Sequence, residues 1–351
     1  MHTTLFSFVI LIVSLSLVGC TNQAADQSHI DAVAHQPGIV LLRYSRGSAS
    51  TEQRELGFLE TLEKEAPQIH ILSSSEYAGT TPESAKAAAG RILEHYGDAV
   101  QGIFAVCEPN TDGVLRALEE AKKTNKIKFI GFDPNPVVVA ALSERKIDGV
   151  ILQDPVQMGY IAVRTMIKHL NGETIPRAIS TGEYIATPDN LDDQSLQPLL
   201  RPQQFSGKHS EPIELKHTIA VITKGRTHSF WESVRQGAET AATEAGDVTI
   251  EFKAPMLESD LEGQIKIIEK FIEDKVSGIC LVPIDAVRQV EVVKKAKQQG
   301  VPVLIFDSDL HDDDQLKISY VATDNYEAGA LAARRLAEVV GASKTQVTRQ
   351  Q

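Results

Sequence analysis

The sequence has few cysteine residues, few aromatic residues and no excess of positive charge. Only three of its 351 residues are cysteine, which excludes a disulfide framework and a cysteine-rich metal site. Its 35 basic residues are outnumbered by 47 acidic ones, a formal net charge of -12, so nucleic acid is not an expected partner. With 42% hydrophobic residues, the chain is long enough to build two domains or lobes with real cores, and its composition is that of a globular protein.

Motifs of common enzymes are also missing. The sequence contains no Gly-x-Ser-x-Gly, no Gly-x-x-x-x-Gly-Lys loop, no His-Glu-x-x-His and no Gly-x-Gly-x-x-Gly after a strand. A run of four polar residues, 311–314, is interpreted as a solvated turn, because calcium loops need ligands at alternating positions and a closing Glu. These absences favour a binding protein over an enzyme, with no cofactor and no metal expected.

The N-terminus carries the one membrane signal. Residues 5–17 form an apolar run that is too short to span a bilayer but suits a signal peptide. The run ends in Leu17-Val18-Gly19-Cys20, which resembles the lipobox of bacterial lipoproteins, although no Lys or Arg precedes it. Residues 1–20 are therefore expected to be a lipoprotein signal peptide with Cys20 as the lipidated residue, and 21–36 a flexible tether. A plain signal peptide or an uncleaved anchor is the alternative.

Short apolar runs alternate with amphipathic stretches from residue 37 onward, which is typical of βαβ units around parallel sheets. The strands are expected at 38–43, 68–73, 102–107, 127–132, 148–153, 218–223, 247–252, 277–282, 301–306 and 317–321, and the helices at 51–65, 82–96, 111–124, 136–145, 155–171, 229–245, 259–274, 284–299 and 325–340. The pattern breaks at 201–216, which has two prolines and no periodicity and is expected to be a linker. Residues 342–351 are expected to form a tail.

Polar and aromatic residues gather where strands end, and ligands of open parallel sheets bind beyond those ends. Two strands end alike, in Phe132-Asp133 and Phe306-Asp307, and others end in Lys224, Cys107-Glu108 and Gln153. Arg54 and the pair Phe230-Trp231 lie in the first turns of the following helices. Carboxylates, an arginine and aromatic faces together make a sugar site. Each has a plainer alternative: the aspartates as helix caps, the aromatics as core residues, and the arginine as a surface ion-pair partner.

These residues resemble those of the periplasmic binding protein type 1 family, specifically its ribose-binding-protein-like sugar binders of ABC transporters. Segment 217–341, with Ser229-Phe230-Trp231 and Phe306-Asp307, resembles the family's first half, and segment 37–200, with Arg54-Glu55-Leu56-Gly57-Phe58 and Gly131-Phe132-Asp133, resembles its second half. The halves are thus in reversed order. We interpret this as a circular permutation joined by the linker, and a fragment of a fused tandem gene is the alternative.

The resemblance implies two Rossmann-like α/β lobes with parallel sheets, joined by three hinge crossings and closing on ligand. By resemblance, one lobe takes 37–132, 180–200 and 324–341, and the other takes 133–179 and 217–323. The hinges are expected near Thr323-Asp324, Phe132-Asp133 and Ile179-Ser180.

The resemblance also implies a ligand site. Asp307 and Asp133 would hold ligand hydroxyls, Arg54 and Gln153 would add hydrogen bonds, and Phe230 and Trp231 would stack on the ligand. At four further site positions the sequence differs from the ribose binders: Lys224, His228, Ser308 and Cys107. Glu108 completes the expected set of ligand-binding residues. Ribose itself is therefore not implied, and a Lys and a His in the cleft raise the possibility of an anionic sugar. Tyr77 and Thr80 align loosely with another aromatic contact.

The expected function is capture of a small carbohydrate by hinge closure and delivery to an ABC transporter permease. The lipid on Cys20 would anchor the protein to the membrane on the periplasmic side of the cell envelope. The alternatives are a sensor that docks on a receptor, and a sugar-processing enzyme that uses Asp133 and Asp307 as acid and base. A transcription repressor is disfavoured, because the chain starts with a secretion signal rather than a helix-turn-helix.

Overall fold

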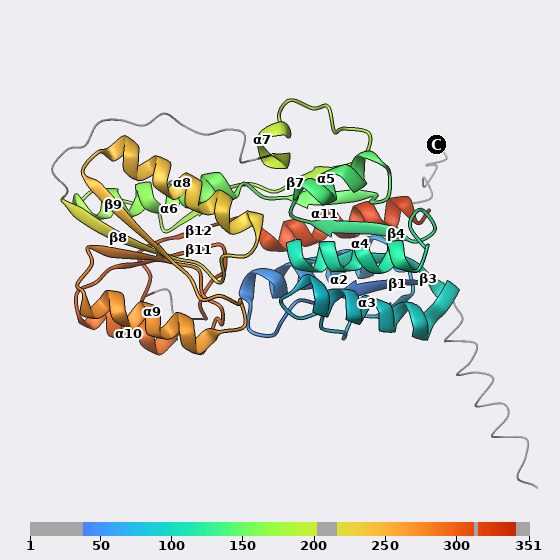
Figure 1. Ribbon diagram of the computed structural model, residues 1–351, viewed down its shortest axis with the longest axis horizontal. Coiled ribbons are helices and arrows are strands. Elements are labelled where there is room, and N and C mark those ends of the chain that lie inside the picture. The colour runs from blue at the N-terminus through green and yellow to red at the C-terminus, as the bar shows by residue number, and fades with distance from the viewer. Residues whose placement is uncertain (1–37, 202–215, 312–314, 342–351) are drawn as a thin grey trace, which may run out of the picture. The chain divides into compact units, whose positions relative to one another are not determined.

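The computed structural model describes residues 38–201, 216–311 and 315–341, which build two sheets in two lobes (Figure 1). The expected signal peptide, Cys20, the tether, most of the linker and the tail lie outside the described residues, as do residues 312–314 of the polar run. The sheet of the first lobe has the strand order β2(Ile71–Ser73), β1(Gly38–Leu42), β3(Val100–Ala105), β4(Lys128–Phe132), β5(Gly149–Leu152) and β7(Tyr184–Ala186). All of its pairs are parallel except that of β7 with β5.

The sheet of the second lobe repeats this design. Its order is β6(Ala178–Ser180), β12(Tyr320–Ala322), β11(Val303–Phe306), β10(Gly278–Leu281), β8(His217–Ile222) and β9(Val248–Lys253), and every pair is parallel. The central strands read as continuous apolar runs, such as the wholly buried Gly38–Leu42, because helices cover both faces of a parallel sheet. The sequence analysis therefore located the α/β class and the central strands, and it missed the short edge strands β6 and β7.

Helices cover both faces of each sheet (Figure 1). In the first lobe, α3(Pro82–Tyr96), α4(Glu108–Glu120), α5(Pro136–Ser143) and the short α7(Gln197–Leu200) share one core, and α2(Ala49–Glu65) and α11(Asn325–Val339) share the other. In the second lobe, α6(Pro155–Leu170) and α8(Ser229–Ala245) cover one face, and α9(Leu261–Glu273) and α10(Val290–Gln298) cover the other. None of the helices within the described ranges has the length and apolar character needed to cross a membrane.

Within the described residues, the chain crosses between the lobes three times; it also leaves the first lobe after α7 and enters the second at β8, through a segment whose middle, 202–215, lies outside those residues. It crosses after β5 at Gln153-Asp154, between β6 and β7 at residues 181–183, and after β12 at Thr323-Asp324. The side chains of Asp154 and Asp324 cap the helices that follow, accepting from the main-chain N–H of Gln157 and Glu327.

The expected crossing at Phe132-Asp133 is wrong, and so is the assignment of 133–152 to the second lobe. Strand β5 pairs in parallel with β4, with Ile130 opposite Gly149, so both strands belong to the first sheet. The chain turns at Asp133, whose φ of 61° breaks the strand, and then returns through α5 to the same sheet. A polar residue after an apolar strand marks the end of that strand, but not the direction in which the chain continues.

One close helix pair in each lobe brings the site residues together. Helices α2 and α11 touch at glycines, since a Cβ on Gly57 would lie 2.0 Å from the Tyr326 carbonyl oxygen and one on Gly329 would lie 2.0 Å from that of Arg54. Helices α6 and α8 meet in the same way at Gly159. This spacing places the start of α11, with Asn325, directly beside Arg54 of α2.

Candidate ligand-binding site

Side chains from both lobes line one cavity at the carboxyl ends of the strands. Among the eleven expected ligand-binding residues, the cavity wall includes Arg54, Cys107, Glu108, Asp133, Gln153, Lys224, His228, Phe230, Trp231 and Asp307. Ser308 is not in the wall, although its Oγ accepts a hydrogen bond from the main-chain N–H of Ser50 across the lobes (3.1 Å). Tyr77 and Thr80 are not in the wall either, and the Tyr77 ring instead lies 4.7 Å from the Arg46 guanidinium.

Asp133 and Asp307 occupy equivalent places in the two lobes. Each follows a central strand and has a left-handed backbone, with φ of 61° and 60°. Each main-chain N–H is still bonded to the neighbouring strand, to Ile151 O and Val321 O at 2.9 Å. Neither aspartate caps a helix; the cap of α5 is Asn135. Aspartate tolerates this backbone region better than most residues do, and the two turns place both carboxylates in the cavity wall.

Arg54 is buried, with an exposed fraction of 2%, and it anchors the first lobe's side of the cavity. Its Nε donates to Asn325 Oδ1 (2.8 Å), and its terminal nitrogens donate to Val106 O and Gln153 Oε1 (both 2.9 Å). Gln153 Nε2 in turn donates to Asp133 Oδ1 (2.7 Å). The guanidinium lies 3.9 Å from the centre of the Phe132 ring. The surface ion-pair alternative for Arg54 is therefore wrong.

Lys224 enters the cavity from the second lobe, after β8. Its Nζ donates to Ser48 Oγ (3.1 Å) and Ser50 Oγ (3.3 Å) in the first lobe, and lies 3.6 Å from Asp307 Oδ2. All three ammonium hydrogens therefore have protein oxygens within reach. Lys224 neutralises Asp307 and ties the two lobes together.

Aromatic side chains form the second lobe's wall. The rings of Phe230 and Trp231 meet edge to face, 4.8 Å between centres. Both rings also pack in the core between α6 and α8. Phe230 and Trp231 are therefore core residues and part of the cavity wall at the same time. Trp231 Nε1 donates to Glu258, which also accepts from the Tyr44 hydroxyl of the first lobe, and His228 Nε2 lies 3.6 Å from Glu258 Oε1.

Glu108 joins the two lobes beside the cavity. Its carboxylate, in the first turn of α4, accepts from the main-chain N–H of Phe230 (3.1 Å) and from Ser229 Oγ (3.0 Å). These donors form the N-terminus of α8, where backbone N–H groups and the helix dipole favour an anion. Glu108 therefore connects the first lobe to the second when the lobes are together.

Five wall residues were missed by the sequence analysis. These are Tyr44, Ser50, Thr51, Pro109 and Glu258. Tyr44 follows strand β1 and could have been found by the same strand-end rule. Glu258 lies in the loop between β9 and α9, at an edge of the sheet, and no local pattern in the sequence marks it.

Burial and neighbouring charge perturb three ionisable groups of the cavity. Burial, together with the negative charge of Glu258, raises the pKa of the Tyr44 hydroxyl well above its usual value. Burial raises the pKa of Asp133 to about 7. The positive charge of Arg54 and the hydrogen bond from Gln153 oppose this rise, and the negative charges of Glu108 and Asp307 add to it. Burial also raises the pKa of the Cys107 thiol, which keeps it in the neutral form. No cluster of His, Cys, Asp and Glu side chains within the described ranges has the arrangement of a metal site.

The cavity is nearly closed. Its volume is about 40 Å³, room for about three waters, and protein hydrogen bonds cross it from one lobe to the other. A sugar ring needs more room than this, so ligand entry requires the lobes to separate.

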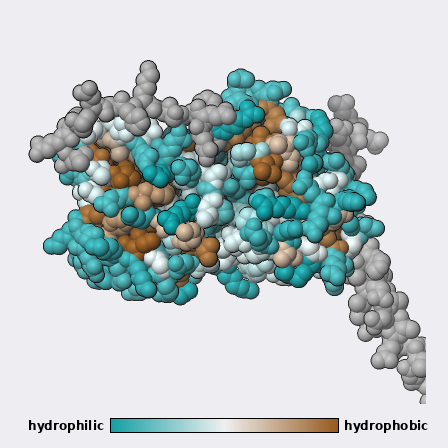
Figure 2. Space-filling model, viewed as in Figure 1, coloured by the Kyte–Doolittle hydropathy of each residue, from teal (hydrophilic) through white to brown (hydrophobic). Residues whose placement is uncertain are grey.

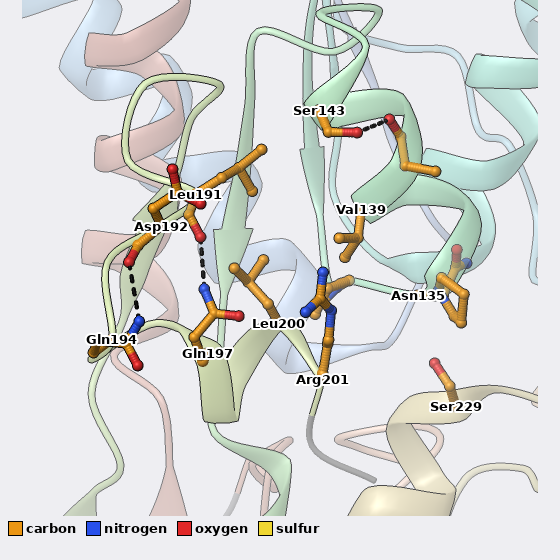
Figure 3. Close-up of a pocket in the computed structure, with 13 residues that line it drawn as sticks. Asn135, Val139, Ser143, Leu191, Asp192, Gln194, Gln197, Leu200, Arg201 and Ser229 are labelled. Atoms are coloured by element: carbon orange, nitrogen blue, oxygen red, sulfur yellow. Dashed lines mark hydrogen bonds between the residues drawn. The ribbon is translucent and has the colours of Figure 1, made fainter. Parts of the chain in front are cut away.

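A larger groove of about 860 Å³ lies beside the cleft (Figure 3). Val139 of α5 and Leu200 of α7 face each other across it, with Ser229 of the second lobe at its far side. Figure 2 shows an apolar patch on the surface over α5, where Val137 is exposed. The groove contains none of the paired charges of the cleft, so we assign the ligand site to the cleft.

Comparison with known proteins gives the family. The sequence profile of the family described as "Periplasmic binding protein domain" matches residues 18–174 and 219–348, more than half of the chain. The chain belongs to the periplasmic binding protein family. The two matched segments include all of the expected cleft residues.

Individual relatives of this periplasmic binding protein match over shorter lengths. The D-allose-binding periplasmic protein of Escherichia coli is 27% identical over 36% of this chain and 42% of its own length. The ribose import binding protein RbsB of Haemophilus influenzae is 28% identical over 47% of this chain and 56% of its own. The chain thus spans about half the length of the curated relatives it matches. The solved structure of GanP, a glucose-galactose binding protein from Geobacillus stearothermophilus, has a TM-score of 0.57 at 14% identity, covering 89% of this chain and 94% of that one, which shows the shared fold.

Proposed function

We propose that this protein captures a small carbohydrate in the cleft between its lobes and delivers it to an ABC transporter. The observation that carries the proposal is the cavity itself. It combines two equivalent aspartates, a buried arginine and an aromatic wall at the carboxyl ends of two parallel sheets. Carboxylates accept hydrogen bonds from neighbouring hydroxyls, and aromatic faces pack on the C–H face of a sugar ring. Names of relatives that include allose and ribose support the same ligand class.

Binding and closure are coupled in this proposal. Arg54 and Asp133 belong to the first lobe, and Trp231 and Asp307 to the second, so a ligand contacts both sets only when the lobes are together. That differential contact shifts an open–closed equilibrium toward the closed form. The closed form then carries the ligand to the permease.

The location follows from the same proposal. A periplasmic binding protein acts outside the cytoplasmic membrane, and a lipid on Cys20 would hold it at that membrane. The lipobox-like Leu17-Val18-Gly19-Cys20 supports this, and lipoproteins with several acyl chains are anchored stably. Replacing Cys20 by Ala should release the protein from membranes, which fractionation measures; a membrane-bound C20A variant would contradict the lipid anchor.

The order of the chain supports a circular permutation. Side-chain atoms of Val340, after α11, and Ile39, in β1, lie 3.2 and 3.3 Å from the place of a Cβ on Gly102, so these two segments are adjacent in space. A reordered protein, in which a short loop joins 341 to 38 and the chain is opened in the linker, should fold and bind the same ligand. Failure of both would favour the tandem-fragment alternative.

Fluorescence of Trp231, the only tryptophan, gives the direct test of ligand binding. Full-length protein freed of ligand by unfolding and refolding would be titrated with neutral, amino and acidic monosaccharides. A saturable change with at least one sugar, lost in Asp307→Asn but kept in the surface variant Asp274→Asn, is the expected result. No response from folded protein across the panel would contradict the proposal. Sugar chemically altered during the titration would favour the enzyme alternative instead.

A further inference from the structure

The charges lining the cleft are unequal in number. Among the described wall residues, the acidic side chains are Glu108, Glu258, Asp307 and Asp133, and the raised pKa of Asp133, about 7, leaves it only partly charged near neutral pH. The permanently basic side chains are Arg54 and Lys224, and His228 is charged only when protonated. A cavity walled by protein screens such charges far less than water does. The imbalance therefore bears on the charge of the ligand.

Both basic side chains are committed to the protein. Lys224 directs its ammonium group to Ser48, Ser50 and Asp307. Arg54 uses three of its five N–H donors on Asn325, Val106 and Gln153, and its charge opposes that of Asp133. An acid group on the ligand would thus compete with oxygen atoms that both cations already contact. The anionic-sugar hypothesis therefore loses its support from Lys224.

The acidic side chains differ in how they are compensated. Asp307 is paired with Lys224, Asp133 lies in the field of Arg54, and Glu108 is held by the N-terminus of α8. The hydrogen bonds that Glu258 receives come from neutral donors, the Tyr44 hydroxyl and the Trp231 indole. His228 Nε2 lies 3.6 Å from Glu258 Oε1, the same separation as that between Lys224 Nζ and Asp307 Oδ2, but a histidine pairs with a carboxylate only when it is protonated. Glu258 therefore has no permanently charged partner among the described wall residues.

We propose that the ligand carries a protonated amine, as an amino sugar does, and that this amine binds beside Glu258. The proposal rests on the proposed sugar-binding function and specifies its ligand. Glu258 is 8% exposed, and each of its two oxygens accepts one hydrogen bond, which leaves further acceptor capacity for an ammonium group. The rings of Tyr44, Phe230 and Trp231 line the same cavity, and aromatic faces attract cations. An ammonium group would therefore gain an ion pair and aromatic contacts at one place.

Isothermal titration with a matched series of ligands tests this. For each of glucose, galactose and mannose, the full-length protein would be titrated with the parent hexose, the 2-amino sugar, its N-acetyl derivative and the uronic acid where available. The expected result is at least tenfold tighter binding of one amino sugar than of its parent and its N-acetyl form, the size of one charge-assisted hydrogen bond. Equal binding of parent and amine, or preference for the acid, would overturn the proposal while leaving sugar binding intact. No binding of any sugar would instead overturn the proposed function.

Two variants locate the amine. Glu258→Gln keeps the shape and an acceptor for Tyr44 or Trp231 but removes the charge, so the preference for the amine over its parent should fall toward one. The control is Glu262→Gln in α9, an exposed residue paired with Arg288, which should leave the preference unchanged. An unchanged preference in folded Glu258→Gln would place the amine elsewhere and overturn the assignment. If that variant does not fold, the ligand comparison in the native protein still decides the charge of the ligand.

Discussion

Replacing Glu108 by Gln should weaken closure of the cleft. The carboxylate in the first lobe accepts hydrogen bonds from Ser229 Oγ and the Phe230 N–H in the second lobe, and it faces the N-terminus of α8. Hydrogen bonds to a charged group contribute about 1.5–3 kcal/mol, so loss of the charge should cost about 2 kcal/mol, or about 30-fold in the closing equilibrium. Because apparent affinity scales with the closed fraction, the ligand Kd should rise by up to about 30-fold.

Small-angle scattering and ligand titration together check this prediction. The ligand-free Glu108→Gln protein should have a larger radius of gyration than the native protein, and saturating ligand should restore the compact value. Glu119→Gln, on the same helix but in an exposed ion pair with Lys146, is the matched control and should change neither quantity. If Glu108→Gln bound ligand as tightly as the native protein and stayed as compact, Glu108 would not hold the lobes together.

Three further predictions concern helix packing, ligand affinity and the pH dependence of stability. Gly57→Ala should destabilise the fold by about 1–3 kcal/mol, because the added Cβ would meet the Tyr326 carbonyl oxygen. Gly90 lies on an open helix face, so Gly90→Ala should stabilise the fold. Thermal unfolding of both variants measures these changes. Arg54→Lys should reduce ligand affinity at least tenfold in titration, because lysine cannot donate to three separate acceptors in the plane of the guanidinium, and unchanged affinity would remove Arg54 from the site. Asp133 has a raised pKa of about 7 in the folded protein. Between about pH 4 and pH 7 the folded protein therefore holds a proton that the unfolded chain has released, so the free energy of unfolding should decrease as the pH rises through this range. Asp133→Asn should flatten that part of the stability profile, and an unchanged slope would assign it to other groups.

Local patterns predicted the sheets and most of the cleft. Apolar runs bounded by turns placed the central strands because both faces of a parallel sheet are buried. The residues immediately after those strands, such as Asp133, Asp307 and Lys224, could be named because strand ends meet at one edge of a sheet. The local signal and the site coincide wherever a central strand delivers the residue.

The remaining features depend on contacts between distant segments. Glu258 lies in a loop at the edge of the sheet and accepts a hydrogen bond from Tyr44, which is more than 200 residues away in sequence. No periodic pattern in the sequence therefore indicates that Glu258 belongs to the cavity. The return of the chain through α5 to the first sheet depends on pairing of β4 with β5. The expected role of Lys224 as a ligand contact also depended on partners that the sequence does not show, since Ser48 and Ser50 lie on the other lobe.

A crystal structure with the tightest-binding sugar would test the central claim most directly. The account predicts one sugar between the lobes, with its ring against Trp231 and Phe230 and its polar groups within hydrogen-bond distance of Asp133, Asp307 and Arg54. An amino group, where present, should lie beside Glu258. A sugar bound instead in the groove between α5 and α7, with the cleft still closed on its own side chains, would contradict it.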